Sequence, residues 1–135
     1  QLVKEKKLFS SISAYSTETI DDGLLMVEGK LSKDVSMDTA EKAVEEALNE
    51  MIQNKVAEEE LVKVKNKIEA YNVFSEVNIL NRAMNLAYFD MLGNAADVNK
   101  ELEKYTAVTS LQLQQAAAAI FRKENSSTIR YFSKN

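Results

Sequence analysis

The chain has 135 residues, 45% hydrophobic and 28% charged, so it can build one compact core with little room for a second domain. Its net charge of −4, from 21 acidic and 17 dispersed basic residues, disfavours a nucleic-acid partner. The lack of His and Cys excludes disulfides, Ser-His-Asp and Cys-His nucleophile systems, and zinc sites built from imidazole or thiolate. Carboxylate pairs and Ser–Lys dyads stay open, and no apolar run reaches the roughly 18 residues of a membrane span.

The first part of the chain predicts the end of a helix followed by a β-hairpin. Residues 1–7 are typical of a helix end, and residues 10–16 alternate small, apolar and aromatic side chains as strands do. Asp21-Asp22-Gly23 supplies a turn, because glycine accepts positive φ and aspartate can bond its own backbone. Residues 24–31 form the second strand. Because side chains alternate along a strand, one face of it is expected to be covered and the other to be wet or to line a cavity. The covered face would carry Leu25, Val27 and Leu31, and the other face Met26, Glu28 and Lys30.

Helical periodicity follows the hairpin. The clearest helix spans residues 38–54, where Ser36 or Asp38 can cap it. A second begins at Ala57, because three consecutive glutamates in its first turn complement the helix dipole. The pattern continues beyond residue 73, so either one long helix bends near Ser75 or two helices meet there.

The last third of the chain predicts a helix end, two further helices and a closing strand. Gly93 ends the long helical region, and a short polar helix spans residues 96–104. Thr109 is placed to cap a helix over residues 111–122, and residues 128–133 predict a strand. The order β-β-α-α-α-α-β indicates an α+β fold, with helices packed on one face of an antiparallel sheet.

The pattern also indicates an incomplete unit. Gln1 falls inside an expected helix and no initiator Met is present, so we expect residues 1–135 to be a single domain or a fragment of one. The hairpin edges are then open unless the last strand or an absent segment covers them. We therefore expect self-association, since the strands carry only Glu28, Lys30 and Arg130 as charged guards.

Three segments together resemble the second half of an insulinase/pitrilysin-like peptidase domain, a family that includes the mitochondrial processing peptidases. LVKEKKLFSSISAYS, residues 2–16, is similar to the family's helix-to-strand segment. LVKVKNKIEA, residues 61–70, resembles a family helix of the form E-L-x-x-x-K. YTAVTSLQLQQAAAAIFRKENSSTIRYF, residues 105–132, resembles the closing pattern of cap, Ala-rich helix, turn and strand. The three occur in the family's order and span nearly the whole chain.

This resemblance implies a clamshell zinc metallopeptidase whose active half carries an H-x-x-E-H motif, while the related other half has lost it. The motif is absent here, so no catalytic, cofactor-binding or metal-binding residue is expected in this chain. Zinc is expected in the parent's other domain, and the partners are that catalytic domain, in the same protein or another subunit, and a peptide substrate. The expected role is a non-catalytic domain that confines substrate; the alternative is an inactive scaffold or partner subunit.

In the family, the inactive half often contributes an Arg and a Tyr that reach toward the zinc. Those positions align with Val3 and Ser10, which cannot make the same hydrogen bonds. Either direct assistance has been lost, or other side chains stand in for the missing pair: Tyr15, Lys4, Lys6 or Lys7. For Ser11, Ser13 and Tyr15 the two interpretations are a solvated strand face and a chamber lining.

Overall fold

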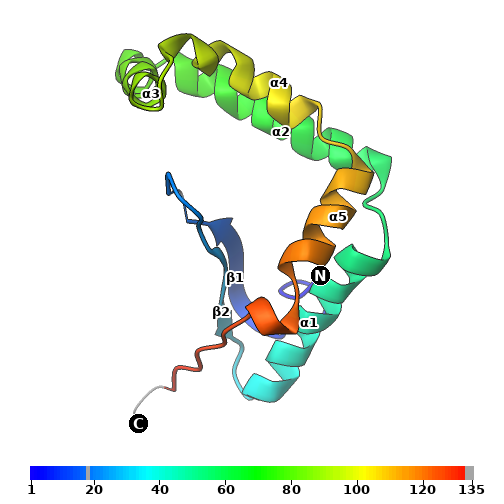
Figure 1. The fold of residues 1–135 in the computed structure, drawn as a ribbon. Coiled ribbons are helices and arrows are strands. Elements are labelled where there is room, and N and C mark those ends of the chain that lie inside the picture. Colours follow the sequence, from blue (N-terminus) through cyan, green and yellow to red (C-terminus); the bar gives the residue numbers. More distant parts are fainter. Residues whose placement is uncertain (18, 133–135) are drawn as a thin grey trace. The chain divides into compact units, whose positions relative to one another are not determined.

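The structure is a computed structural model that describes residues 1–17 and 19–132, and these residues form an α+β fold (Figure 1). Two strands are followed by five α-helices and two short 3-10 helices: β1 (Phe9–Ser16), β2 (Leu25–Leu31), α1 (Met37–Gln53), α2 (Glu58–Glu76), α3 (Ile79–Met91), η1 (Ala95–Lys100), α4 (Glu101–Thr106), α5 (Ser110–Ile120) and η2 (Lys123–Asn125). The chain divides into two compact units. The first comprises residues 1–50 and the C-terminal residues from Lys123, and the second comprises residues 51–122.

The hairpin is the centre of the first unit. β1 and β2 pair antiparallel, and Ser10 is an extra residue in β1 that shifts the register between Phe9 and Ser11. The Ser10 hydroxyl donates a hydrogen bond to the Lys30 carbonyl at 3.0 Å. Such a bulge bends the strand locally and leaves its partner regular. Across the ladder, the ring of Phe9 packs over Gly29, where an added Cβ would stand 2.6 Å from ring carbon Cε1.

Helix α1 supplies the other buried residues of the first unit. Ser36 caps it, since its Oγ accepts from the Thr39 amide at 3.2 Å, so the first of the two predicted caps is the one used. Ala40 and Ala43, one turn apart, are buried together with Phe9. The small side chains allow close packing on this face. Lys6 forms an exposed ion pair with Glu46 at 3.4 Å, which holds the N-terminal turn to α1.

In the second unit, the long helical region is two helices. α2 ends at Glu76, and Asn78 begins α3 by accepting from the Leu80 amide at 2.9 Å. The side chain of Asn81 donates to the Ser75 carbonyl, so polar groups satisfy the backbone at the break. α4 lies beside α2, whereas α3 turns away at the end of α2 (Figure 1), and Leu61 of α2 is buried.

The ends of the later helices follow their predicted signals. Gly93, at φ +120°, follows α3, as expected for a glycine beyond a helix end. Thr109 forms a capping box with Gln112 at the start of α5, in which each side chain bonds the other residue's backbone. Gln114 of α5 donates to the carbonyls of Ile52 and Gln53 at 2.9 and 3.1 Å. These bonds satisfy carbonyls at the end of α1 that have no partner within the helix.

The predicted fold class is confirmed, but two expected elements differ. Residues 1–7 form one turn, closed by bonds from the Glu5 and Lys6 amides to the Gln1 carbonyl, rather than a helix. The prediction of a closing strand over residues 128–133 is wrong for residues 128–132, which form no strand. Ser133 lies outside the described residues. A strand needs a partner for its amides and carbonyls, and here Arg130 is instead drawn to α1 by two carboxylates.

Much apolar surface of the second unit stays open. The predicted stripe continues into α3, yet no residue of α3 is buried. Within this unit the most exposed large apolar residues gather where α2 meets α3: Tyr71, Phe74, Val77, Ile79 and Leu80. No helix among the described residues is both long enough and apolar enough to span a membrane.

Gly29→Ala is expected to lower the free energy of unfolding by about 1–3 kcal/mol, because the added methyl would clash with the Phe9 ring. Phe9 is only 6% exposed, so the ring has little room to move. Urea denaturation followed by circular dichroism measures the change. In the Phe9→Leu background the loss should be smaller, and an equal loss in both backgrounds would contradict the assigned contact.

Leu61→Ala is expected to lower the free energy of unfolding by about 2–5 kcal/mol, because it leaves a cavity in the second unit. The neighbouring change Val62→Ala is the matched control, with an expected effect below about 0.5 kcal/mol. Leu61 is 5% exposed and Val62 is 44% exposed. Chemical denaturation of both variants measures the two losses of unfolding free energy. Equal losses would show that Leu61 is not the residue by which α2 packs.

Candidate functional site

The two faces of the hairpin differ in chemistry. Because of the bulge, Phe9 lies on the same face as Ile12 and Ala14, opposite Leu31, Gly29 and Val27. The other face, here called the open face, is formed by three cross-strand pairs: Ser11 with Lys30, Ser13 with Glu28, and Tyr15 with Met26. The predicted division of residues 25–31 into two faces therefore agrees with the observed register.

The open face is polar and accessible. Ser11, Ser13, Glu28 and Lys30 are exposed and line a shallow depression over the middle of the hairpin. Tyr15 is 45% exposed at the end nearer the turn. Two hydroxyls, a carboxylate and an ammonium thus lie on neighbouring strands. This set can donate and accept hydrogen bonds with a peptide of varied sequence.

The open face is not built as a nucleophilic dyad. A Ser–Lys dyad requires a direct bond between the hydroxyl and the amine. Ser11 and Lys30 are cross-strand partners, but their described side chains form no hydrogen bond with each other. The serine side chain that does bond Lys30 is Ser10, whose hydroxyl donates to the Lys30 backbone carbonyl. The hydroxyls therefore serve as hydrogen-bonding groups.

The residues considered as stand-ins for an assisting Arg and Tyr are dispersed. Val3 lies in the N-terminal turn, and Ser10 satisfies the backbone at the bulge. Lys6 is engaged with Glu46. Lys7 has a left-handed backbone, with φ 51°, where the turn enters β1. Among these candidates only Tyr15 belongs to the open face, so the structure does not gather them into one site.

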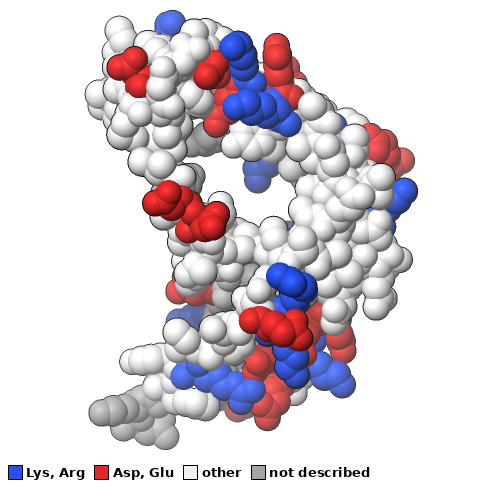
Figure 2. Space-filling model, in the orientation of Figure 1, with Lys and Arg blue, Asp and Glu red and all other residues white. Residues whose placement is uncertain are grey.

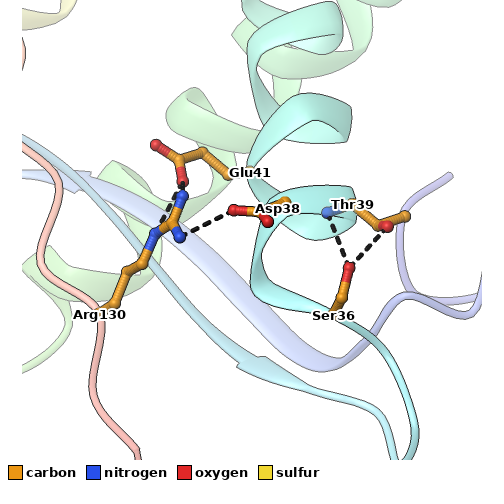
Figure 3. A network of polar contacts seen from close by, with 5 residues as sticks. All are labelled: Ser36, Asp38, Thr39, Glu41 and Arg130. Carbon is orange, nitrogen blue, oxygen red and sulfur yellow. Dashed lines mark hydrogen bonds and ion pairs between the residues drawn. The ribbon is translucent and has the colours of Figure 1, made fainter.

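A second polar cluster, at the start of α1, joins residues far apart in the sequence (Figure 3). Arg130 donates from Nε to Glu41 Oε2 at 3.1 Å and from a terminal nitrogen to the same oxygen. Its other terminal nitrogen lies 2.8 Å from Asp38 Oδ1. These hydrogen bonds, first to Glu41 and then to Asp38, raise the pKa of the Arg130 guanidinium above its ordinary value. Arg130 remains charged and cannot act as a base.

Sequence reasoning did not anticipate this cluster. Arg130 was assigned as a charged guard on a strand, and Asp38 as a possible helix cap. Acidic residues in the first turn of a helix are common, since they complement the dipole, so they do not point to a distant partner. A lone arginine in a strand-like segment is the only available signal, and it does not identify the acids that it meets.

The described residues do not suit the zinc that the family implies. No group of three or more His, Cys, Asp or Glu among residues 1–17 and 19–132 is arranged to hold a metal ion. The carboxylates of Asp38 and Glu41, which lie near each other on α1, are both engaged by Arg130. A catalytic zinc takes three protein ligands, with imidazole usually among them. No catalytic step through a metal can therefore be assigned to this chain.

Among the described residues, Lys100 is the other cation with a perturbed pKa. A hydrogen bond to Asp97, at 2.9 Å, raises the pKa of its ammonium, so Lys100 is protonated at neutral pH. Lys100 and Asp97 form an exposed ion pair within η1. This pair belongs to the second unit, whereas the open face belongs to the first. On the face drawn in Figure 2, acidic and basic side chains are interspersed over both units.

Comparison with known structures shows the same fold in proteases. The chain is similar to the inactive peptidase domain of an inferred zinc protease from Bordetella parapertussis, with a TM-score of 0.84 and 19% identity, over 96% of this chain and 69% of that one. An inferred zinc protease from Bordetella pertussis Tohama I gives a TM-score of 0.81 and 19% identity, over 96% of this chain and 71% of that one. A protease from Helicobacter pylori gives a TM-score of 0.85 and 14% identity, over 93% of this chain and only 30% of that one.

The family assignment comes from the sequence. A comparison with curated protein sequences found no significant match. A family model described as the peptidase M16 inactive domain matches residues 1–68, half of the chain, which contain the hairpin and α1. This agrees with the resemblance carried by residues 2–16 and 61–70. The chain therefore belongs to the peptidase M16 family, as a domain of its inactive, C-terminal type.

Proposed function

We propose that this chain is a non-catalytic domain of a zinc-dependent peptidase and that the open face of its hairpin lines the chamber that holds the peptide substrate. The observation that carries the proposal is the match of residues 1–68 to an inactive peptidase domain, since the whole hairpin lies within the matched residues. The domain would pair with a catalytic domain, in the same protein or in a partner subunit, and that domain would supply the zinc.

The chemistry of the open face supports this role. Confinement needs a wall that tolerates many peptide sequences, and exposed hydroxyls bond backbone amides and carbonyls without regard to the side chain. Glu28 and Lys30 add one charge of each sign, so the face repels neither acidic nor basic peptides as a whole. On the opposite face Phe9 is the residue that is buried, so the packing of the hairpin does not use the hydroxyls and charges of the open face.

The alternative function is an inactive scaffold or partner subunit. One observation favours it: Val3 and Ser10 occupy the positions where the family resemblance expects an assisting Arg and Tyr, and neither reaches a shared site. The two functions differ in one respect. A chamber wall contacts substrate and therefore affects its binding, whereas a scaffold affects only assembly.

The chain by itself is expected to bind no stoichiometric zinc and to cleave no peptide, because it has neither His nor Cys to hold a catalytic metal. Metal analysis after dialysis and a fluorogenic peptide assay measure the two properties. One equivalent of zinc that survives dialysis would overturn the assignment of the metal to another domain.

In a preparation that contains the cognate catalytic domain, recognised by its H-x-x-E-H motif, Glu28→Gln with Lys30→Gln is expected to raise KM roughly 2- to 10-fold and to change kcat little. The reason is that these residues would contact bound substrate without touching the reacting atoms. Steady-state kinetics on several peptides measures the effect. Glu45→Gln, an exposed change on α1, is the matched control. Unchanged KM in the folded double variant would reject the chamber wall and leave the scaffold.

A further inference from the structure

The two charged residues of the open face are available to a ligand. Glu28 and Lys30 are alternate residues of β2, so their side chains leave the same face of the strand about 7 Å apart. Both are exposed, and both line the shallow depression over the middle of the hairpin. Among the residues that the structure describes, neither forms an ion pair, in contrast to Lys6, Lys100 and Arg130.

The residue types of the open face, and not only its exposure, indicate that it meets water or a polar ligand. A segment that covered this face would remove a carboxylate, an ammonium and two hydroxyls from water. Burial of such groups costs free energy unless each gains a partner of matching charge or hydrogen-bonding type. A ligand of this face is therefore itself polar and carries both a positive and a negative group. The opposite face, with Phe9 and Gly29, has no such requirement.

An extended peptide has the same repeat as the strand beneath it. Every second side chain of the peptide points to the same side, at the same spacing of about 7 Å. Strands packed face to face stand about 10 Å apart, a distance that a long acidic and a long basic side chain can bridge together. A basic residue of the peptide can then meet Glu28 while an acidic residue two positions away meets Lys30. Adjacent residues of a peptide cannot do this, because they point to opposite sides.

We infer that the open face selects, among peptide substrates, those that carry a basic and an acidic side chain two residues apart. The inference rests on the proposed function, since it takes the bound peptide to lie along the hairpin, and it adds the substrate class that the chamber wall prefers. The cross-strand partners of Glu28 and Lys30 are Ser13 and Ser11, so no charged residue directly opposite on β1 competes for the side chains of the peptide. The two serines bond the peptide backbone without regard to its sequence.

The order of the two charges fixes the direction of the peptide. A peptide whose basic residue precedes its acidic residue matches Glu28 and Lys30 when it runs parallel to β2, and the opposite order matches when it runs antiparallel. A catalytic centre in the same chamber cleaves a peptide bond in one orientation, so only one direction of the chain is productive. One order is therefore a better substrate than the other, although both peptides have the same composition.

Three peptides of identical composition test the inference on a preparation that contains the cognate catalytic domain. One has Lys two residues before Glu, one has Glu two residues before Lys, and one has the two residues adjacent. One of the first two is expected to have the lowest KM, roughly 2- to 10-fold below that of the adjacent-pair peptide, because exposed ion pairs are weak. The exchange variant, Glu28→Lys with Lys30→Glu, keeps the composition of the domain and leaves the catalytic domain untouched. In this variant the preferred order is expected to reverse.

The neutral variant, Glu28→Gln with Lys30→Gln, distinguishes the charge preference from the chamber wall itself. Its KM for the preferred peptide is expected to rise to that of the adjacent-pair peptide. Fluorescence anisotropy of labelled peptides, on a preparation freed of zinc by chelation so that no cleavage occurs, is expected to rank the Kd values in the same order. A KM that rises equally for all three peptides, or an exchange variant that keeps the original order, would overturn the charge preference and leave the chamber wall. A KM unchanged for every peptide would overturn the chamber wall, and this inference with it.

Discussion

The alternation of side chains along two paired strands governs what the first unit of this domain can do. In a ladder each residue faces one side of the sheet or the other, so the register decides at once which side packs and which meets solvent. Here the bulge at Ser10 keeps Phe9 on the covered side, over Gly29, and so aligns the two apolar rows. If Ser10 were instead paired in a regular ladder, Phe9 would fall on the open face, among the serines, and the unit would lose its largest buried side chain.

The start of α1 illustrates how a local arrangement acquires a tertiary role. Ser36 caps the helix, which frees Asp38 from capping. Asp38 and Glu41 are then available to a cation from elsewhere, and Arg130, which follows Glu41 by 89 residues in the sequence, pairs with both. Exposed ion pairs of this kind contribute little to stability. What these ion pairs do is fix the position of Arg130 beside α1. The apolar residues next to Arg130 remain exposed to solvent.

The two units of the chain differ in secondary structure and in the kind of surface that they expose. The first unit contains most of the residues that match the family model and presents a polar face on its hairpin. The second unit is helical, with Leu61 and Ala117 buried and a wide apolar surface around the junction of α2 and α3. A helix that is apolar on more than one side normally has more than one neighbour. The second unit therefore leaves apolar surface that its own described residues do not cover.

By itself the sequence determined the features that depend on neighbours in the chain. The period of two in residues 25–31, the cap at Thr109 and the helix end at Gly93 are local, so their physics can be read from a few adjacent residues. The absence of His and Cys likewise limited the chemistry without any structure. Only the tertiary structure decided the bulge at Ser10, the separation of α2 from α3 at Asn78, and the fate of the last segment, which has strand composition but forms no strand. Strand pairing and ion pairs join residues distant in sequence, and composition does not say which partner is within reach. For that reason the composition of the last segment predicts Arg130 on a strand, whereas the structure places it beside Asp38 and Glu41.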